Sequence, residues 1–375
     1  MISQRTSSRY ACIDPRLAGL AASILALLVC GTARGQGVPA RAGIAPAGDR
    51  RPAGVPAHYV ITPHGYFDPS CIVELRSDEK LDAVDNIVAA DGARRPLRMC
   101  LFPHYHKDGR AAGPLFEPPT VNSWVADVNS SSTGASSWIS ANWTVPHNPT
   151  SVGSQVVYFF PGFEPLATGD TILQPVLGWN HINTGPGWTI ASWNCCRNGN
   201  NLHSPLVSVS AGANLFGYVW GTGCNTQSGV CSNWQVLTSA ANGGQTTLNT
   251  ASYGEVLDWD FAGALEAYNV NVCQEYPPDN GITFQNVTVR NASGATVQPS
   301  WSTQLLTVTP ACSRSASFTN TSATINWCVP LSAGAACGDA CDTTAPDGCG
   351  GTVTCPACPP PTGCDTCPTC IICPG

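Results

Sequence analysis

The chain has 375 residues and a formal net charge of −7, and only 11% of its residues are charged. A weakly acidic chain without a basic patch argues against nucleic acid as a partner. Glycine (37) and proline (31) are abundant, and no long stretch has the apolar periodicity of a helix. The composition therefore predicts an all-β protein that is rich in turns, with room for one large domain and appendages.

Residues 1–35 have the pattern of an export signal. Arg5, Arg9 and Arg16 lie near an apolar run at 17–29, and small residues that suit cleavage follow the run. The run is too short to predict a membrane span. We therefore expect a secreted, extracellular protein with no membrane span, and a monomer.

The cysteines agree with export. Two of the 20 lie in the signal; the others divide as two in 37–120, six in 121–327 and ten in 328–375. Even numbers predict that each segment closes its own disulfides in an oxidising compartment. We expect Cys71 to pair with Cys100, and Cys224 with Cys231 across a short turn. The partners of four others stay open: Cys195, Cys196, Cys273 and Cys312.

Residues 36–118 are predicted to be a pro-segment or a small N-terminal domain. This stretch is rich in charged residues, whereas residues 121–327 contain no lysine and only three arginines. Because opposite charges attract, we expect the segment to bind the acidic β domain and to be removable. Short strands are expected at 66–75 and 96–103. His64, His104 and His106 show no recurring ligand spacing, so we expect exposed histidines and no metal site.

Residues 119–328 are predicted to form the catalytic domain. About a dozen strand-like runs and no credible helix fit an antiparallel two-sheet β-sandwich of the concanavalin A-like or jelly-roll type. The runs are 138–145, 155–160, 171–179, 188–193, 206–209, 215–220, 233–238, 256–261, 264–272, 283–289, 304–308 and 323–327.

Residues 329–375 are predicted to form a cysteine-rich tail. Its Cys-x-x-Cys spacings, such as Cys355 with Cys358, are also typical of metal ligands. In an exported chain we favour disulfides. We expect the tail to be dispensable for catalysis, and we predict neither a metal nor a cofactor for the protein.

Acids and amides are the candidate catalytic groups of the β domain. It has no Gly-x-Ser-x-Gly motif, no His-Glu-x-x-His motif and no Asp-Thr-Gly or Asp-Ser-Gly pair. His147, His181 and His203 are isolated and are expected on the surface. Gln174 and Glu266 are each the one strongly polar side chain in an apolar, strand-like run. A carboxylate in such a place loses hydration and needs a partner or a chemical role.

Four pieces of the β domain resemble the glutamic peptidases, or eqolisins. The resemblance covers roughly residues 121–327 and is carried by 156–162, 172–174, 188–193 and 264–266. It implies a sandwich of two seven-stranded antiparallel sheets in which Gln174 is the catalytic amide and Glu266 the catalytic acid. Neprosin-like relatives pair two glutamates, so Gln174 points to the eqolisin branch. A family glutamate near the site falls on or close to Ser192, which is a departure.

The chemistry of the two side chains fits hydrolysis of peptide bonds in polypeptide substrates. Amide hydrolysis needs a base for water, a donor to the oxyanion and an acid for the leaving nitrogen. A desolvated glutamate has a raised pKa, so it can act as base and then acid in mildly acidic conditions. The amide of Gln174 offers both a donor and an acceptor. Tyr158 and Trp193 are expected to line the cleft.

The alternative is a carbohydrate-binding or glycoside-hydrolysing β-sandwich, whose tryptophans would stack on sugars. Glu255 and Asp258 suggest clustered carboxylates, which a retaining glycosidase would need about 5 Å apart. On a strand, their spacing puts them on opposite faces, which weakens this alternative. A non-catalytic secreted adhesin is a third hypothesis.

Overall fold

The structure is a computed structural model that describes residues 50–112, 124–166, 171–241 and 243–359. The expected export signal and the cysteines after residue 359 lie outside the described residues. Of the helices in these four ranges, none is long and apolar enough to cross a membrane.

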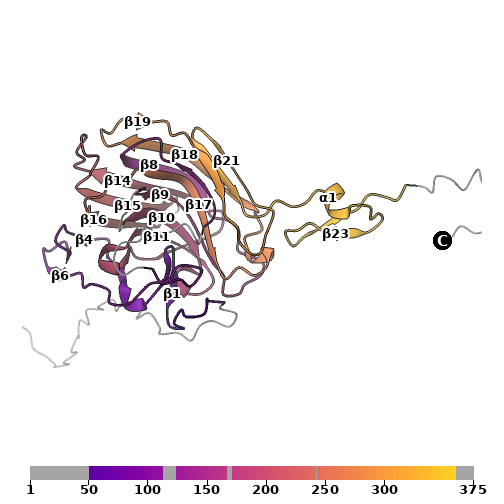
Figure 1. Ribbon diagram of the computed structural model, residues 1–375, viewed down its shortest axis with the longest axis horizontal. Coiled ribbons are helices and arrows are strands. Elements are labelled where there is room, and N and C mark those ends of the chain that lie inside the picture. Colours follow the sequence, from indigo (N-terminus) through magenta and orange to yellow (C-terminus); the bar gives the residue numbers. More distant parts are fainter. Residues whose placement is uncertain (1–49, 113–123, 167–170, 242, 360–375) are drawn as a thin grey trace, which may run out of the picture. The chain divides into compact units, whose positions relative to one another are not determined.

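Two β-sheets pack face to face, as the composition and alternation predicted (Figure 1). The nine-stranded sheet has the order β20 (Ser302–Leu305), β7 (Trp124–Ser130), β17 (Trp259–Tyr268), β9 (Val156–Glu164), β10 (Ile172–Trp179), β11 (Trp188–Cys195), β12 (Asn201–His203) and β3 (Ile72–Glu74), with β13 (Val207–Val209) beside β11. The eleven-stranded sheet has the order β21 (Ser315–Thr319), β22 (Ser322–Asn326), β18 (Gly281–Asn291), β8 (Ser136–Thr144), β14 (Asn214–Thr222), β15 (Asn233–Ala240), β16 (Gln245–Ala251), β4 (Lys80–Leu81), β5 (Asn86–Val88) and β6 (Arg94–Pro96), with β19 (Thr296–Val297) beside β18.

The central strands β9, β10 and β17 of the nine-stranded sheet bury both of their faces. Along β9, Val157, Phe159 and Phe163 join the core between the two sheets, whereas Tyr158 and Phe160 join a second apolar cluster. Successive side chains on a strand point to opposite faces, so the second cluster lies on the outer face of this sheet. We call this surface the outer face.

The N-terminal segment, residues 50–112, covers the outer face and adds strands to both sheets. It contains β1 (Val60–Thr62), β2 (Gly65–Phe67) and a 3₁₀ turn at Pro69–Cys71. Its strand β3 pairs in parallel with β12, and its strand β4 pairs in parallel with β16. Leu75 and Leu97 of the segment are buried in the core between the sheets. The segment is therefore integrated into the sandwich.

The sequence located the strands of this segment only in part. The stretch 66–75 contains β2 and β3, but of the stretch 96–103 only Pro96 is in a strand. The rest forms a connection whose Cys100 N–H donates to the carbonyl of Asn198 in the sandwich. The expected disulfide between Cys71 and Cys100 is present.

Ion pairs between the segment and the sandwich contribute less to their attachment than the charge difference in the sequence predicted. The arginines Arg76, Arg94 and Arg95 form ion pairs with acids of the segment itself. A described ion pair from segment to sandwich joins Asp85 to Arg197 at 2.8 Å, so the acid is in the segment and the base in the sandwich.

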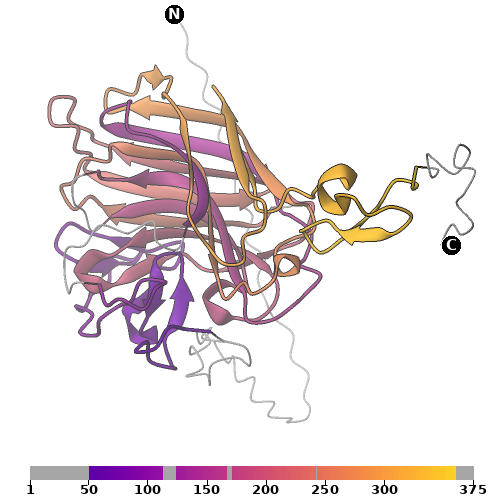
Figure 2. The same cartoon turned by 45° about the vertical axis from the view of Figure 1, so that its right-hand side comes forward.

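Seven disulfides close among the described residues, and each lies within its own segment, as the even counts predicted. The expected pair Cys224–Cys231 is present. The structure supplies the pairings that stayed open, Cys195–Cys196 and Cys273–Cys312. In the tail, three disulfides hold α1 (Ala333–Cys337), β23 (Thr344–Pro346) and β24 (Thr352–Thr354), which are yellow in Figure 2. These are Cys328–Cys349, Cys337–Cys355 and Cys341–Cys358.

Candidate active site

Gln174 and Glu266 lie on the outer face of the nine-stranded sheet. Gln174 is in β10, where Ile172 and Val176 on either side of it belong to the outer apolar cluster. Glu266 is in β17, between Ala264 and Tyr268 of the same cluster. Both side chains are 0% exposed. The period-two alternation of their strands therefore puts the two predicted catalytic groups on one covered surface.

Strand register fixes where the four predicted site residues lie on that face. Strand β9 separates β17 from β10. Glu266 pairs directly with Tyr158 of β9, and Gln174 pairs directly with Trp193 of β11. Leu173 pairs with Phe163, so Gln174 is level with Gly162, four positions along β9 from Tyr158. Gln174 and Glu266 are thus two strands and four positions apart, on a diagonal of the sheet.

Another pair on the same face has the same offset, and its members interact. Asp127 of β7 is level with Phe160 of β9, because both pair with Ala264, and Glu164 lies four positions further along β9. Burial, and then the charge of Asp127, raises the pKa of Glu164 well above its usual value. Asp127 and Glu164 are therefore within electrostatic reach of each other on the outer face.

The side-chain amide of Gln174 is buried without a hydrogen-bond partner among the described residues. Neither its Oε1 nor its Nε2 has one. Its strand neighbours are Trp193 on one side and Gly162 on the other, and a Cβ on Gly162 would lie 2.6 Å from the ring of Phe261. An unsatisfied buried amide costs about 1–3 kcal/mol per group, and such a group in a native structure calls for an explanation. A water molecule or a substrate carbonyl would satisfy it.

Glu266 is held in place by its neighbours. The hydroxyl of Tyr268 donates to Glu266 Oε1 at 2.5 Å. Burial lowers the pKa of Lys107 to about 8, and the charge of Glu266 opposes this shift. Burial raises the pKa of Tyr158 well above its usual value, and the charge of Glu266 adds to that shift. The carboxyl group is therefore surrounded by two tyrosines and one lysine, all of which can donate hydrogen bonds.

Trp193 contacts two buried histidines, so the prediction that His181 and His203 are surface residues is wrong. Its ring stacks on His181 and His203, with centroids 5.5 and 4.7 Å away, and its indole N–H donates to His181 Nε2 at 3.1 Å. Burial lowers the pKa of His181 to about 3 and that of His203 to about 4. Both therefore form a neutral wall beside Gln174. His147 is exposed, as predicted.

Ser192 points away from this face. Its hydroxyl lies 3.1 Å from the hydroxyl of Thr238, which belongs to the eleven-stranded sheet. A side chain at this position projects between the sheets, so Ser192 takes no part in the candidate site.

The N-terminal segment contacts three of the four predicted site residues. The hydroxyl of Tyr158 donates to the carbonyl of Ile61 at 2.9 Å. The ring of His64 lies edge-on to Trp193, with centroids 6.1 Å apart. Lys107 interacts electrostatically with Glu266. The segment therefore covers the outer face at these residues, and Gln174 and Glu266 are both 0% exposed.

His64, His104 and His106 of the segment are not exposed, contrary to the sequence prediction. His106 is 5% exposed, and burial lowers the pKa of His64 to about 3. Among the described residues, the one group with the spacing of metal ligands is Cys341, Asp342 and Cys358, and its two cysteines are joined in a disulfide.

The sequence missed Asp127 and Glu164. Both are buried, and burial raises the pKa of Asp127 to about 6. Each acid alternates with apolar residues in its strand, which is the signal that would have found them. Glu255 and Asp258, the carboxylates that the sequence did single out, lie before β17 and outside any strand. The expectation that they point to opposite faces assumed a strand, so it does not apply to them. Asp258 accepts a hydrogen bond from the N–H of Leu166 at 2.8 Å.

Comparisons with known proteins gave structural neighbours only. No protein-family model matches the sequence, and no curated protein matches it. Two similar solved structures are of scytalido-glutamic peptidase with transition-state analogues, at 14% identity and TM-scores of 0.39 and 0.37. A third is a member of the eqolisin family of peptidases with the tripeptide Ala-Ile-His, at 13% identity and a TM-score of 0.39. Each similarity covers 54% of this chain and 97% of the other.

Proposed function

We propose that the protein is a secreted endopeptidase of the glutamic-peptidase type that acts in acid. The observation that carries this proposal is the unsatisfied amide of Gln174, fully buried on the same face as Glu266. An amide and a carboxyl group on one protected surface supply the donor, the acceptor and the proton carrier that amide hydrolysis needs. The seven described disulfides support export to an oxidising compartment.

In the proposed mechanism, a water molecule lies between the two side chains. Glu266 takes a proton from this water as its oxygen attacks the carbonyl carbon of the peptide bond. The Nε2 group of Gln174 donates a hydrogen bond to the oxyanion that forms, and its Oε1 accepts one from the water. Glu266 then gives the proton to the leaving nitrogen as the C–N bond breaks. The cycle returns Glu266 to its ionised form and needs no covalent intermediate.

Tyr158 and Trp193 are proposed to line the substrate cleft. They pair with Glu266 and Gln174 across neighbouring strands, so they form the floor on either side of the reacting bond. Both are 0% exposed beneath the segment. We therefore propose that residues 36–118 keep the enzyme latent and are removed on activation. No disulfide among the described residues ties the segment to the sandwich, so after one cut beyond Ala112 the described contacts that still hold it would be non-covalent.

The test is the Glu266→Gln variant, compared with the wild-type enzyme after removal of the segment. The substitution keeps the shape but removes the proton acceptor, so release of peptides from a denatured protein in acid should stop. Glu255→Gln is the matched control and should keep full activity. Wild-type hydrolysis by a correctly folded Glu266→Gln enzyme would refute the assignment.

Glycoside hydrolysis remains the second candidate, and one observation favours it. Asp127 and Glu164 are two interacting carboxyls with raised pKa on the same face, as a general acid and its partner would be. Release of reducing sugar that is lost in both Asp127→Asn and Glu164→Gln, with no release of peptides, would establish this function instead.

A further inference from the structure

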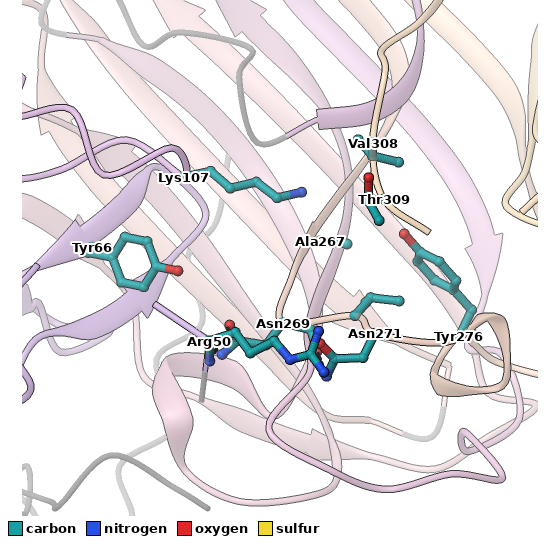
Figure 3. A pocket seen from close by; sticks show the side chains of 10 residues that line it. Arg50, Tyr66, Lys107, Ala267, Asn269, Asn271, Tyr276, Val308 and Thr309 are labelled. Atoms are coloured by element: carbon teal, nitrogen blue, oxygen red, sulfur yellow. Dashed lines mark hydrogen bonds between the residues drawn. The ribbon is translucent and has the colours of Figure 1, made fainter. Parts of the chain in front are cut away.

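A cavity of about 230 Å³ lies between the N-terminal segment and the residues that follow Glu266 in the chain (Figure 3). The segment contributes Arg50, Tyr66 and Lys107, and the amino group of Lys107 points toward the opposite wall (Figure 3). None of the described lining residues is acidic. The wall opposite the segment consists of Ala267, Asn269, Val270, Asn271, Tyr276, Val308 and Thr309.

The wall on the sandwich side is held in a fixed position. The disulfide Cys273–Cys312 joins the chain beside Tyr276 to the chain beside Thr309. The carboxylate of Glu275 accepts the backbone N–H of Asn271, so its charge is already engaged in the turn. A pre-formed wall lowers the entropic cost of binding a small ligand.

The charged side chains that line the cavity among the described residues are the cations Arg50 and Lys107. Burial lowers the pKa of Lys107 to about 8, which leaves it charged at neutral pH; Glu266 opposes this shift, and Arg314 adds to it. Arg314 is fixed by a hydrogen bond of 2.5 Å to the carbonyl of Leu306, and its charge also lowers the pKa of Tyr276 against the effect of burial. A cluster of Arg50, Lys107 and Arg314 stands out in a chain with a net charge of −7. Such a site favours an anion.

The shape of the cavity narrows the choice of anion. Its volume equals that of about seven or eight water molecules at roughly 30 Å³ each, which suits a ligand the size of an amino-acid residue. Ala267, Val270 and Val308 give it an apolar side, opposite the cations. We propose that this cavity binds the carboxylate end of a peptide, with the α-carboxylate between Lys107, Arg50 and the hydroxyl of Tyr276, and the last side chain on the apolar side.

This site belongs to the protein with its N-terminal segment in place, because two of the three groups that hold the carboxylate come from the segment. Binding there does not depend on hydrolysis, so it is tested separately from the proposed activity. Ala267 directly follows Glu266 in β17. A bound carboxylate would therefore compete with Glu266 for Lys107.

The experiment is a calorimetric titration of the full chain, with three probes. These are N-acetylalanylvaline, its C-terminal amide and inorganic phosphate. The free acid should bind, and the amide at least tenfold more weakly, because charge-assisted hydrogen bonds to the carboxylate are lost. Lys107→Met should weaken binding of the acid at least tenfold. Lys80→Met, the same change at an exposed site on β4, should leave it unchanged.

Tyr276→Phe provides a second variant in case Lys107→Met does not fold. It keeps the ring and removes only the hydroxyl, and it should weaken binding severalfold. Equal affinity for the acid and the amide would overturn the proposal, as would unchanged binding in both variants. Binding of phosphate as tight as that of the peptide acid would overturn the peptide assignment and leave a site for inorganic anions.

Discussion

The buried carboxyl of Asp260 should make the protein lose stability as the pH rises. Asp260 is 0% exposed and accepts a hydrogen bond from the hydroxyl of Thr133. Burial raises its pKa from 3.8 to about 7. The folded state therefore keeps a proton that the unfolded state loses at about pH 4, so the free energy of unfolding falls as the pH rises from about 4 to 7.

The size of this loss of stability follows from the shift in the pKa of Asp260. Each pKa unit corresponds to about 1.4 kcal/mol. Asp260 alone should therefore lower the free energy of unfolding by on the order of 4 kcal/mol between pH 4 and pH 8. Asp260→Asn is neutral at every pH and should lack this contribution. Buried histidines such as His64 act in the opposite direction, because their lowered pKa makes stability rise with pH over the acid range. The informative quantity is therefore the difference between variant and wild type.

The assay is denaturant unfolding of both proteins at pH 4.5 and pH 8, with the disulfides intact. Relative to the wild type, Asp260→Asn should be more stable at pH 8 than at pH 4.5 by about 3 kcal/mol, because part of the effect has already developed at pH 4.5. The control is Asp91→Asn at an exposed turn, which should leave the pH dependence unchanged. Equal pH dependence in Asp260→Asn and the wild type would refute the reasoning.

The remaining predictions concern the site and the tail. Gln174→Ala should remove the oxyanion donor and lower kcat for peptide hydrolysis by about a hundredfold or more, whereas loss of folding instead would point to a structural role. Gln174→Glu should retain some activity at low pH and lose it steeply as the pH rises, because the ionised acid repels the oxyanion; a flat pH–rate profile would contradict this. A chain that ends near Pro330 should fold and cleave protein, since the described tail disulfides all lie after Trp327; failure to fold would refute it.

Alternation in the sequence predicted the fold well because most strands carry strong apolar signals. Strand β10 reads as one apolar run with a single polar exception, and that exception is Gln174. Both β10 and β17 are apolar on both faces, so it is the structure, and not their sequences, that places Gln174 and Glu266 on the outer face. By contrast, β16 is rich in threonine and asparagine and β12 has only three residues, so neither resembles a buried strand in the sequence. The two runs at 256–261 and 264–272 overlap one strand, β17, whose register shifts within Phe261–Ala264.

The sequence did not reveal contacts between residues that are far apart in the chain. His181 and His203 look isolated in the sequence, yet both lie against the ring of Trp193. The diagonal between Gln174 and Glu266 depends on the register of three strands, which no local pattern encodes. The segment's charged composition suggested attachment through opposite charges, whereas four leucine and isoleucine side chains bind it into the core: Leu75, Leu81, Ile87 and Leu97.

The central claim is that the outer face, covered by the N-terminal segment, is a hydrolytic centre. The most direct measurement is peptide hydrolysis in acid before and after the segment is cut off and separated. For this, residues 113–118 are replaced by the recognition site of a specific protease, and the chain is cut after it has folded. The account predicts almost no hydrolysis before the cut, and activity after it that the Glu266→Gln variant lacks. Equal hydrolysis before and after the cut, or activity that survives Glu266→Gln, would contradict it.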